Sequence, residues 1–192
     1  MALKIFGGSD LSRWSNSGNL LEEWQPRTAT LAKWIPKGSR VIEFGAGNRK
    51  LQPMLDASCT YFASDLVEKP GVTLVCDLNK KPLPNLSEIS PEIAVFSGVL
   101  EYIHDLPTLA AWLATHVNKC LVSYSCVDTR GGALRRIRGA YQRANHGWVN
   151  NYTEPQIVEI FHEVGFQCTD KDHWKDQRLF LFENQRTKKR YD

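Results

Sequence analysis

The stretch Arg40-Val41-Ile42-Glu43-Phe44-Gly45-Ala46-Gly47-Asn48-Arg49-Lys50-Leu51 determines the fold class of this chain. It opens with a short apolar run that contains β-branched residues, which is typical of a buried parallel strand. Gly45 and Gly47 interrupt that strand, and a helix is expected from the N-cap residue Asn48 to Asp56. A strand, a glycine turn and a helix N-terminus together form a ligand pocket, because glycine lets the backbone approach a bound group and the helix end offers unpaired N–H donors.

The rest of the chain alternates short β-rich runs with helical segments. Further strands are expected at residues 60–64, 72–76, 93–97 and 120–124, helices at 105–117 and 153–164, and a final pair of strands at 166–168 and 179–182. Such alternation is typical of a parallel sheet with helices on both faces. The predicted fold is therefore one α/β domain over residues 1–192, Rossmann-like, with a seven-stranded, mainly parallel sheet and a C-terminal antiparallel hairpin.

Two segments outside this alternation are expected to border the ligand site. Residues 1–35 are predicted to form an N-terminal helical arm or lid, with helices at 19–25 and 27–35. Residues 127–152 are predicted to be an insertion that caps the substrate, and they carry an arginine-rich run. That run is interpreted either as a solvated amphipathic helix or as a surface for an acidic group, with Arg135 and Arg138 as candidate contacts.

Composition limits the class of protein. The 24 Lys and Arg residues nearly balance the 21 Asp and Glu residues, and the net charge of +3 does not favour a nucleic-acid partner. No apolar run approaches the roughly 20 residues that span a bilayer, so no membrane partner is expected. The five cysteines contain no Cys-x-x-Cys pair, which indicates free thiols, no structural zinc and a cytoplasmic location.

Acidic residues at strand ends indicate the kind of ligand. Asp65 ends the second predicted strand, about 20 positions after the glycines, where a carboxylate accepts hydrogen bonds from ribose hydroxyls. A dinucleotide would need a third glycine at the position of Lys50, and no Tyr-x-x-x-Lys pair is present for hydride transfer. The ligand is expected to contain adenosine; a dinucleotide such as NAD is disfavoured, and S-adenosylmethionine is the competing cofactor class.

Several segments resemble the class I S-adenosylmethionine-dependent methyltransferases, in their small-molecule branch. Residues 41–47 are similar to motif I of that family, and Asn48 stands where the family commonly has a third small residue. The segments similar to later motifs are Ala63-Ser64-Asp65-Leu66 for the ribose, Cys76-Asp77-Leu78 for the adenine, Phe96-Ser97-Gly98-Val99-Leu100-Glu101-Tyr102-Ile103 for motif IV, and residues 148–166 before the terminal hairpin. The resemblance extends from about Arg27 to Phe182, with all motifs in the order of the family.

The resemblance implies a role for individual residues. The methionine part of the cofactor is expected at Glu43, Gly45, Ala46 and Gly47, the ribose at Asp65 and Leu66, the adenine at Asp77 and Leu78, and the sulfonium near Ser97 and Gly98. Tyr102 and Trp148 are candidates for stacking on an acceptor. His146, with His104 as the second choice, is the candidate catalytic base.

These features predict an enzyme that moves a methyl group from S-adenosylmethionine to an oxygen or nitrogen of a small, anionic or saccharide acceptor. No acidic cluster indicates a metal site, so no metal is expected. Two alternatives stay open. The first is a methyltransferase-like module that binds the cofactor without turnover, and the second is an RNA methyltransferase, which the arginine-rich run alone suggests.

Overall fold

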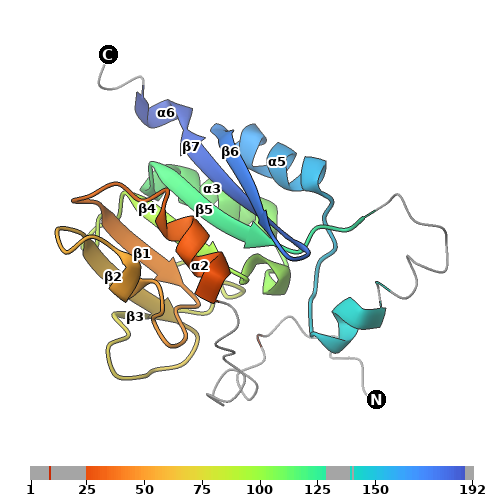
Figure 1. Ribbon diagram of the computed structural model, residues 1–192, viewed down its shortest axis with the longest axis horizontal. Coiled ribbons are helices and arrows are strands. Elements are labelled where there is room, and N and C mark those ends of the chain that lie inside the picture. The colour runs from red at the N-terminus through yellow and green to blue at the C-terminus, as the bar shows by residue number, and fades with distance from the viewer. Residues whose placement is uncertain (1–8, 10–24, 129–138, 140, 189–192) are drawn as a thin grey trace.

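The computed structural model describes residues 9, 25–128, 139 and 141–188 of the chain (Figure 1). Its elements in chain order are α2 (Gln25–Ala32), β1 (Arg40–Phe44), the 3₁₀ turn η3 (Gln52–Met54), β2 (Thr60–Asp65), β3 (Leu74–Val75), β4 (Ile93–Ser97), the 3₁₀ turn η4 (Leu100–Tyr102), α3 (Leu106–His116), β5 (Lys119–Tyr124), α5 (Glu154–Glu163), β6 (Phe166–Trp174), β7 (Gln177–Asn184) and α6 (Gln185–Lys188). None of the helices in these described ranges is long and apolar enough to cross a membrane.

The strands form one seven-stranded sheet in the order β3-β2-β1-β4-β5-β7-β6. β1 pairs in parallel with both β2 and β4, and β4 pairs in parallel with β5. β7 is antiparallel to both β5 and β6, so the final hairpin extends the edge of the sheet. The predicted fold class, including the C-terminal antiparallel hairpin, is confirmed.

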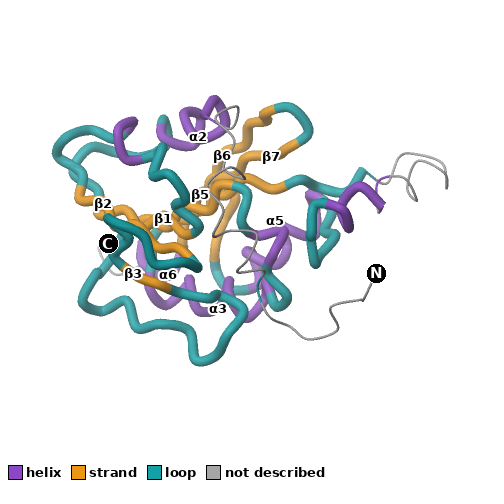
Figure 2. Tube along the Cα trace, turned by 90° about the horizontal axis from the view of Figure 1, so that it is seen from below, coloured by secondary structure: helices purple, strands orange, loops and turns teal. Residues whose placement is uncertain are grey.

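Helices cover the two faces of the sheet unequally. Figure 2 shows α2 on one side of the strands, with α3 and α5 on the other. The larger core lies under α3 and α5, where Leu109 and Phe161 pack against alternate strand residues such as Phe96. The smaller core lies under α2, where Leu31 packs with Val41 and Val95. Alternate residues of β1 and β4 thus face opposite cores, as expected for central parallel strands.

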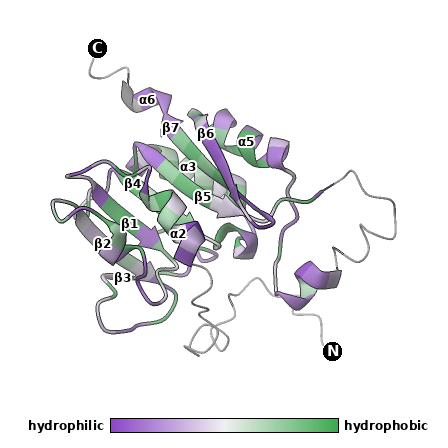
Figure 3. Ribbon diagram, viewed as in Figure 1, coloured by the Kyte–Doolittle hydropathy of each residue, from purple (hydrophilic) through white to green (hydrophobic). Residues whose placement is uncertain are grey.

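The edge strand β6 differs from the central strands. Most of its side chains are exposed, and Figure 3 shows it as largely hydrophilic beside the more apolar β7. Charged side chains on an edge strand hinder pairing with another chain. The sequence predicted only residues 166–168 as strand here, because the charged stretch from Asp170 to Arg178 resembles a loop.

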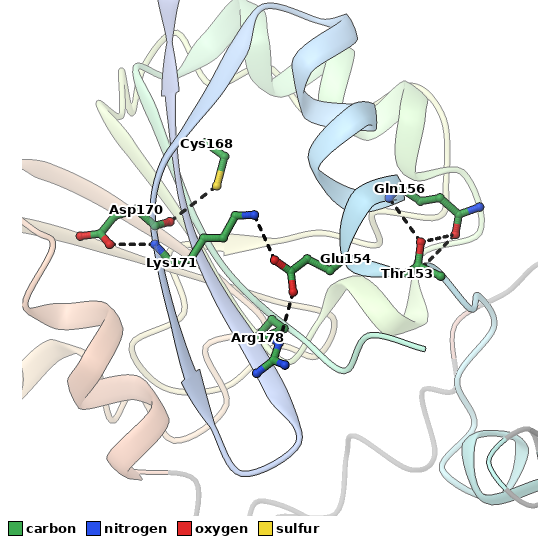
Figure 4. Close-up of polar contacts among 7 residues, drawn as sticks. All are labelled: Thr153, Glu154, Gln156, Cys168, Asp170, Lys171 and Arg178. Atoms are coloured by element: carbon green, nitrogen blue, oxygen red, sulfur yellow. Dashed lines mark hydrogen bonds and ion pairs between the residues drawn. The ribbon is translucent and has the colours of Figure 1, made fainter. Parts of the chain in front are cut away.

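The N-terminus of α5 is held to this hairpin by a cap and an ion-pair cluster (Figure 4). Thr153 and Gln156 form a reciprocal capping box, which satisfies N–H groups of the first turn. Glu154 accepts a hydrogen bond of 3.0 Å from Lys171 of β6 and lies 3.3 Å from Arg178 of β7. The helix expected at 153–164 is therefore confirmed, and its start is positioned against both strands.

Three local predictions are wrong or incomplete. Residues 48–56 do not form the expected helix, and only the three-residue turn η3 is present. Arg49 has a left-handed φ of 54° in this segment, which interrupts a right-handed helix. The third strand is shorter than residues 72–76, and the helix expected at 27–35 is α2, which begins at Gln25 and ends at Ala32. The helix expected at 19–25 lies almost entirely outside the described residues.

Candidate functional site

The candidate site lies at the carboxyl ends of the central parallel strands. β1 stands between β2 and β4, and the strand order reverses there because the chain goes first to β2 and β3 and then to β4 and β5. Open α/β sheets bind ligands at such a switch point. Glu43, Asp65 and Ser97 all lie at the ends of these three strands, so the structure brings together the residues that the sequence placed there.

Two glycines with left-handed backbone conformation line this point. Gly45 has a φ of 66° and Gly98 a φ of 72°. A Cβ atom at Gly45 would lie 2.5 Å from the Val99 side chain, and one at Gly98 would lie 2.6 Å from Nη1 of Arg27. Both conformation and space therefore require glycine. The two turns that follow β1 and β4 pack directly on each other.

Asp65 joins the second strand to the glycine turn. Its side chain is buried, and Oδ2 accepts a hydrogen bond of 2.8 Å from the backbone N–H of Gly47. Oδ1 accepts a hydrogen bond of 2.7 Å from the N–H of Leu66, while the N–H of Ala46 donates to the Ser64 carbonyl. The predicted ribose acid and the predicted glycine turn are thus one hydrogen-bonded unit.

Glu43 is a buried carboxyl group beneath this turn. It is 4% exposed and accepts a hydrogen bond from the hydroxyl of Tyr61. Burial raises the pKa of Glu43 to about 8, against the smaller effects of the Tyr61 hydrogen bond and the positive charge of Arg27. A cation bound beside Glu43 would favour its charged form, so this position suits a positively charged ligand group.

Arg27 of α2 forms part of the floor of the site, although no role was predicted for it from the sequence. It is 5% exposed. Its Nε and Nη2 atoms donate to the hydroxyl and carbonyl of Ser97, and Nη1 donates to Oε1 of Gln177, each at 3.0 Å. Burial lowers the pKa of Arg27, while the nearby Glu101 and Glu43 raise it. An arginine among the apolar positions of a short helix was the one signal available in the sequence.

The loop after β3 is tied to the segment after β4. Asp77 Oδ1 accepts hydrogen bonds from the hydroxyl of Ser9 and the N–H of Asn79. Asn79 Nδ2 donates to the carbonyl of Tyr102 at 2.8 Å, and its Oδ1 accepts from the N–H of His104 at 2.9 Å. Asn79 therefore sets the distance between the predicted adenine loop and motif IV, a role that the sequence analysis did not assign.

A second buried carboxyl group lies beyond Gly98. Glu101 in η4 is 1% exposed, and its Oε1 accepts a hydrogen bond of 2.9 Å from the N–H of Ser125, just after β5. Ser125 also donates from its hydroxyl to Asp176 at 3.4 Å, and its carbonyl accepts from Nη1 of Arg143 at 3.2 Å. Ser125 thus connects β5, the terminal hairpin and the cap at residues 127–152.

The described part of the cap packs aromatic and cationic side chains beside motif IV. Nε1 of Trp148 donates to the hydroxyl of Tyr102 at 3.2 Å, so the two predicted stacking residues are in contact. The exposed ring of His146 stacks on Trp148 at 5.1 Å between centroids, and Arg143 lies 5.8 Å from the Trp148 ring. Arg135 and Arg138 fall outside the described residues.

Two predicted site residues, Leu78 and His104, differ in their exposure. Leu78 is buried beside the adenine loop, and His104 is exposed at the end of motif IV. Within the described ranges, no group of three or more His, Cys, Asp or Glu side chains is arranged to hold a metal ion.

The donor set fits an adenosylated cation. Asp65 offers a buried carboxylate for a diol, Glu43 offers a carboxyl group for a cation, and the glycine turn between them leaves the backbone accessible for a close approach. The residue types and their order at the switch point therefore agree with the cofactor that the sequence predicts.

Comparison with solved structures supports the fold. The chain aligns with 1,6-didemethyltoxoflavin-N1-methyltransferase of Burkholderia thailandensis, solved with S-adenosylhomocysteine, at a TM-score of 0.64 and 17% identity, covering 89% of this chain and 80% of that one. For the putative methyltransferase of Haloferax volcanii in complex with the Trm112 activator, the TM-score is 0.69 at 12% identity, with 93% and 97% covered. The chain also aligns with magnesium protoporphyrin IX methyltransferase of Synechocystis PCC 6803 with bound S-adenosylhomocysteine. Here the TM-score is 0.60 at 16% identity, and the alignment covers 83% of this chain and 82% of that one.

Sequence comparison identifies the family. No curated protein matches the chain in sequence. The profile of the family described as "Methyltransferase domain" matches residues 17–171, which include every strand from β1 to β5 and the described part of the cap. The resemblance seen in the motifs is confirmed, and the ligands of the similar structures agree with the expected cofactor. The chain is a member of the methyltransferase-domain family.

Proposed function

We propose that this chain transfers a methyl group from S-adenosylmethionine to an oxygen or nitrogen of a small molecule in the cytoplasm. The observation that carries the proposal is the hydrogen-bonded pair of Asp65 and the Gly47 backbone at the switch point of a methyltransferase sheet. S-adenosylmethionine supplies a methyl group on a positively charged sulfur. Similar folds in enzymes for toxoflavin, mitomycin and N-acetylserotonin support a small acceptor.

Residues that follow β2 and β3 bind the adenosine part of the cofactor in this proposal. Asp65 is placed to accept hydrogen bonds from the ribose hydroxyls, with Leu66 beside it. Asp77 and the buried Leu78 border the adenine, and Asn79 holds their loop against motif IV.

Residues of β1 and of the glycine turn after it bind the methionine part of the cofactor in this proposal. Glu43 and the backbone of Gly45 to Gly47 hold it, because a buried carboxyl group favours the ammonium and sulfonium charges. Ser97 and Gly98 form the floor near the reacting methyl group, and Arg27 fixes that floor through both Ser97 oxygens.

The cap carries the acceptor contacts in this proposal. Tyr102 and Trp148 form an aromatic wall, and Arg143 lies over the Trp148 ring from the cap side. An anionic or saccharide acceptor suits this mixture of aromatic faces and cationic groups. His146 stacks on the same wall, and with His104 it is the histidine candidate for the base.

Thermal unfolding in the presence of S-adenosylmethionine, S-adenosylhomocysteine and NAD tests the cofactor. A ligand at 100 times its dissociation constant adds about 2.7 kcal/mol, which is a shift of roughly 5–10 °C for a chain of this size. We expect a shift with the first two ligands and none with NAD. A shift with NAD alone would overturn the proposal.

A further inference from the structure

Glu101 carries a carboxyl group in the interior of the protein. Its side chain is 1% exposed, and Oε1 is engaged by the N–H of Ser125. Within the described part of the chain, Oε2 has no hydrogen-bond partner although it is fully buried. A buried polar atom without a partner disfavours folding, so its presence points to a role other than stability.

The segment that carries Glu101 begins at the predicted methyl-transfer point. Glu101 follows Gly98 by three residues, in the turn that leaves the carboxyl end of β4. Its partner Ser125 directly follows the end of β5, the neighbouring strand. The carboxyl ends of these two strands border the acceptor side of the site, because most cofactor residues follow β1, β2 and β3 and only Ser97 and Gly98, at the reacting methyl group, follow β4.

The cap closes over the same residue. The N–H of Val149 donates to the carbonyl of Glu101 at 2.9 Å, and Arg143 donates to the carbonyl of Ser125. Tyr102, the residue after Glu101, contacts Trp148 of the cap. The contacts of the described cap residues therefore converge on the segment that carries Glu101, so an acceptor held by the cap would lie next to this segment.

The charges around Glu101 suit a group that takes up a proton. Burial raises the pKa of Glu101, whereas the backbone N–H groups of Glu101 itself and of Ser125 lower it, as does Arg27 of α2, and Asp176 of the hairpin turn has a smaller raising effect. Tyr124 and Cys126, which flank Ser125, also interact with Glu101. A carboxyl group with a raised pKa is a better general base than an ordinary one.

We propose that Glu101 is a catalytic residue whose free carboxylate oxygen takes the proton of an acceptor hydroxyl or amine during methyl transfer. This inference rests on the proposed function. The acceptor oxygen or nitrogen forms a bond to the methyl carbon, the carbon–sulfur bond breaks with its electron pair remaining on sulfur, and the proton passes to Oε2 of Glu101.

The acceptor class follows from this role. A hydroxyl or amine carries the proton that Glu101 removes, whereas a carboxylate or thiolate acceptor would need no base. The neutral acceptor group would also be the partner that Oε2 lacks. His146, which is exposed and stacks on Trp148, then belongs to the acceptor wall and is not the base.

Glu101→Gln tests the role, since the amide keeps the size and the acceptor for Ser125 but cannot take a proton. Methyl-labelled S-adenosylmethionine is mixed with a protein-free extract of small metabolites, and label transfer is measured against pH. We expect Glu101→Gln to lower the transfer rate at least about 100-fold, the scale of general base catalysis. The wild-type rate should rise with pH as Glu101 loses its proton, and the rise should be absent from the variant.

Glu92→Gln is the matched control. Glu92 lies just before β4, at the end of the strands opposite to the site, and accepts a hydrogen bond from the N–H of Arg40. Glu92→Gln should therefore leave the rate of methyl transfer unchanged. Glu101→Asp, which keeps a carboxylate, should fold and restore part of the rate and its pH dependence. If Glu101→Gln fails to fold, loss of the pH-dependent limb in Glu101→Asp would overturn the role and its retention would support it.

Cofactor binding separates this inference from the proposed function. Glu101→Gln should show the same thermal shift with S-adenosylmethionine as the wild type. A variant that transfers label at the wild-type rate would overturn the role of Glu101 alone. A larger loss in His146→Ala than in Glu101→Gln would also overturn it. A wild type without transfer to the extract would remove the proposed function itself and this inference with it.

Discussion

The carboxylate of Asp65 and the backbone N–H of Gly47 are 2.8 Å apart, and this bond connects the ends of β2 and β1. The acid and the turn are 18 residues apart in the chain, yet they form one surface at the switch point. The bond orients the carboxylate over the glycine turn. It therefore presents Asp65 to any diol that is bound above the turn.

Asp65→Ala should weaken binding of S-adenosylmethionine by about 10- to 100-fold for each ribose hydrogen bond removed, because hydrogen bonds to charged groups contribute about 1.5–3 kcal/mol. Titration calorimetry measures the affinity. Asp56→Ala is a suitable control, since Asp56 pairs with Lys37 on the surface at 3.2 Å. Near-normal affinity in Asp65→Ala would refute the ribose assignment.

Glu43 should release a proton when S-adenosylmethionine binds near pH 7. Its pKa of about 8 means that the free carboxyl group holds its proton, and a cationic ligand shifts it to the carboxylate. Calorimetry in two buffers of different ionisation enthalpy should show release of close to one proton in the wild type. Glu43→Gln should release none, and equal release from both proteins would contradict the prediction.

The raised pKa of Glu43 also makes the free energy of unfolding depend on pH. The pKa of Glu43 is raised in the folded state, from an ordinary value of 4.5 to about 8. Its contribution to the free energy of unfolding is therefore present below about pH 4.5 and is lost as the pH rises to 8. Urea unfolding between these values should show a weaker decline in Glu43→Gln, and an unchanged decline would argue against the raised pKa.

Gly98→Ala should destabilise the protein more than Gly38→Ala. Both glycines have left-handed φ values, 72° and 76°, so each alanine costs about 1–2 kcal/mol in backbone strain. Only at Gly98 would the new Cβ also meet Arg27, because the space around Gly38 is open within 4 Å. Urea unfolding should show a difference of about 1–3 kcal/mol between the variants. Equal losses would mean that Arg27 moves aside freely.

Asn79→Ala should loosen the adenine loop. The side chain joins this loop to Tyr102 and His104, and each lost hydrogen bond contributes about 1 kcal/mol to stability. We expect a loss of about 1–3 kcal/mol in urea unfolding together with weaker binding of S-adenosylmethionine. Asn85→Ala, at an exposed position of the same segment, is the control. A loss of stability without any change in affinity would mean that the link does not position the cofactor residues.

The sequence predicted the sheet well because its strands are short, apolar and bounded by turn residues. β4 was located to the residue and β1 was placed directly before Gly45, since the strand and its boundary are both local signals. The helix predicted after Gly47 is wrong because the conformation of that segment depends on contacts that are distant in sequence. Its expected N-cap at Asn48 is a local signal, but the left-handed turn at Arg49 and the packing of the connection against the sheet are decided by tertiary contacts.

The polar framework of the site was less accessible to prediction. Arg27 meets Ser97 across 70 positions and Gln177 across 150. The bonds of Asn79 and Glu101 likewise join loops whose proximity depends on the finished sheet. Motif similarity located the residues expected to touch the cofactor, whereas those that hold these residues in place carry no local pattern.

The reach of Arg27 to Gln177 has a consequence for biosynthesis. A nascent chain that has emerged from the ribosome only through β5 already holds every residue assigned to the cofactor, yet the guanidinium of Arg27 still lacks its glutamine on β7. Because a buried arginine is costly until its donors are matched, the reaction floor becomes rigid only when the last strand inserts beside β5. Catalytic competence would thus be acquired only after β7 has been synthesised, and ligand affinity could serve as a reporter of that step.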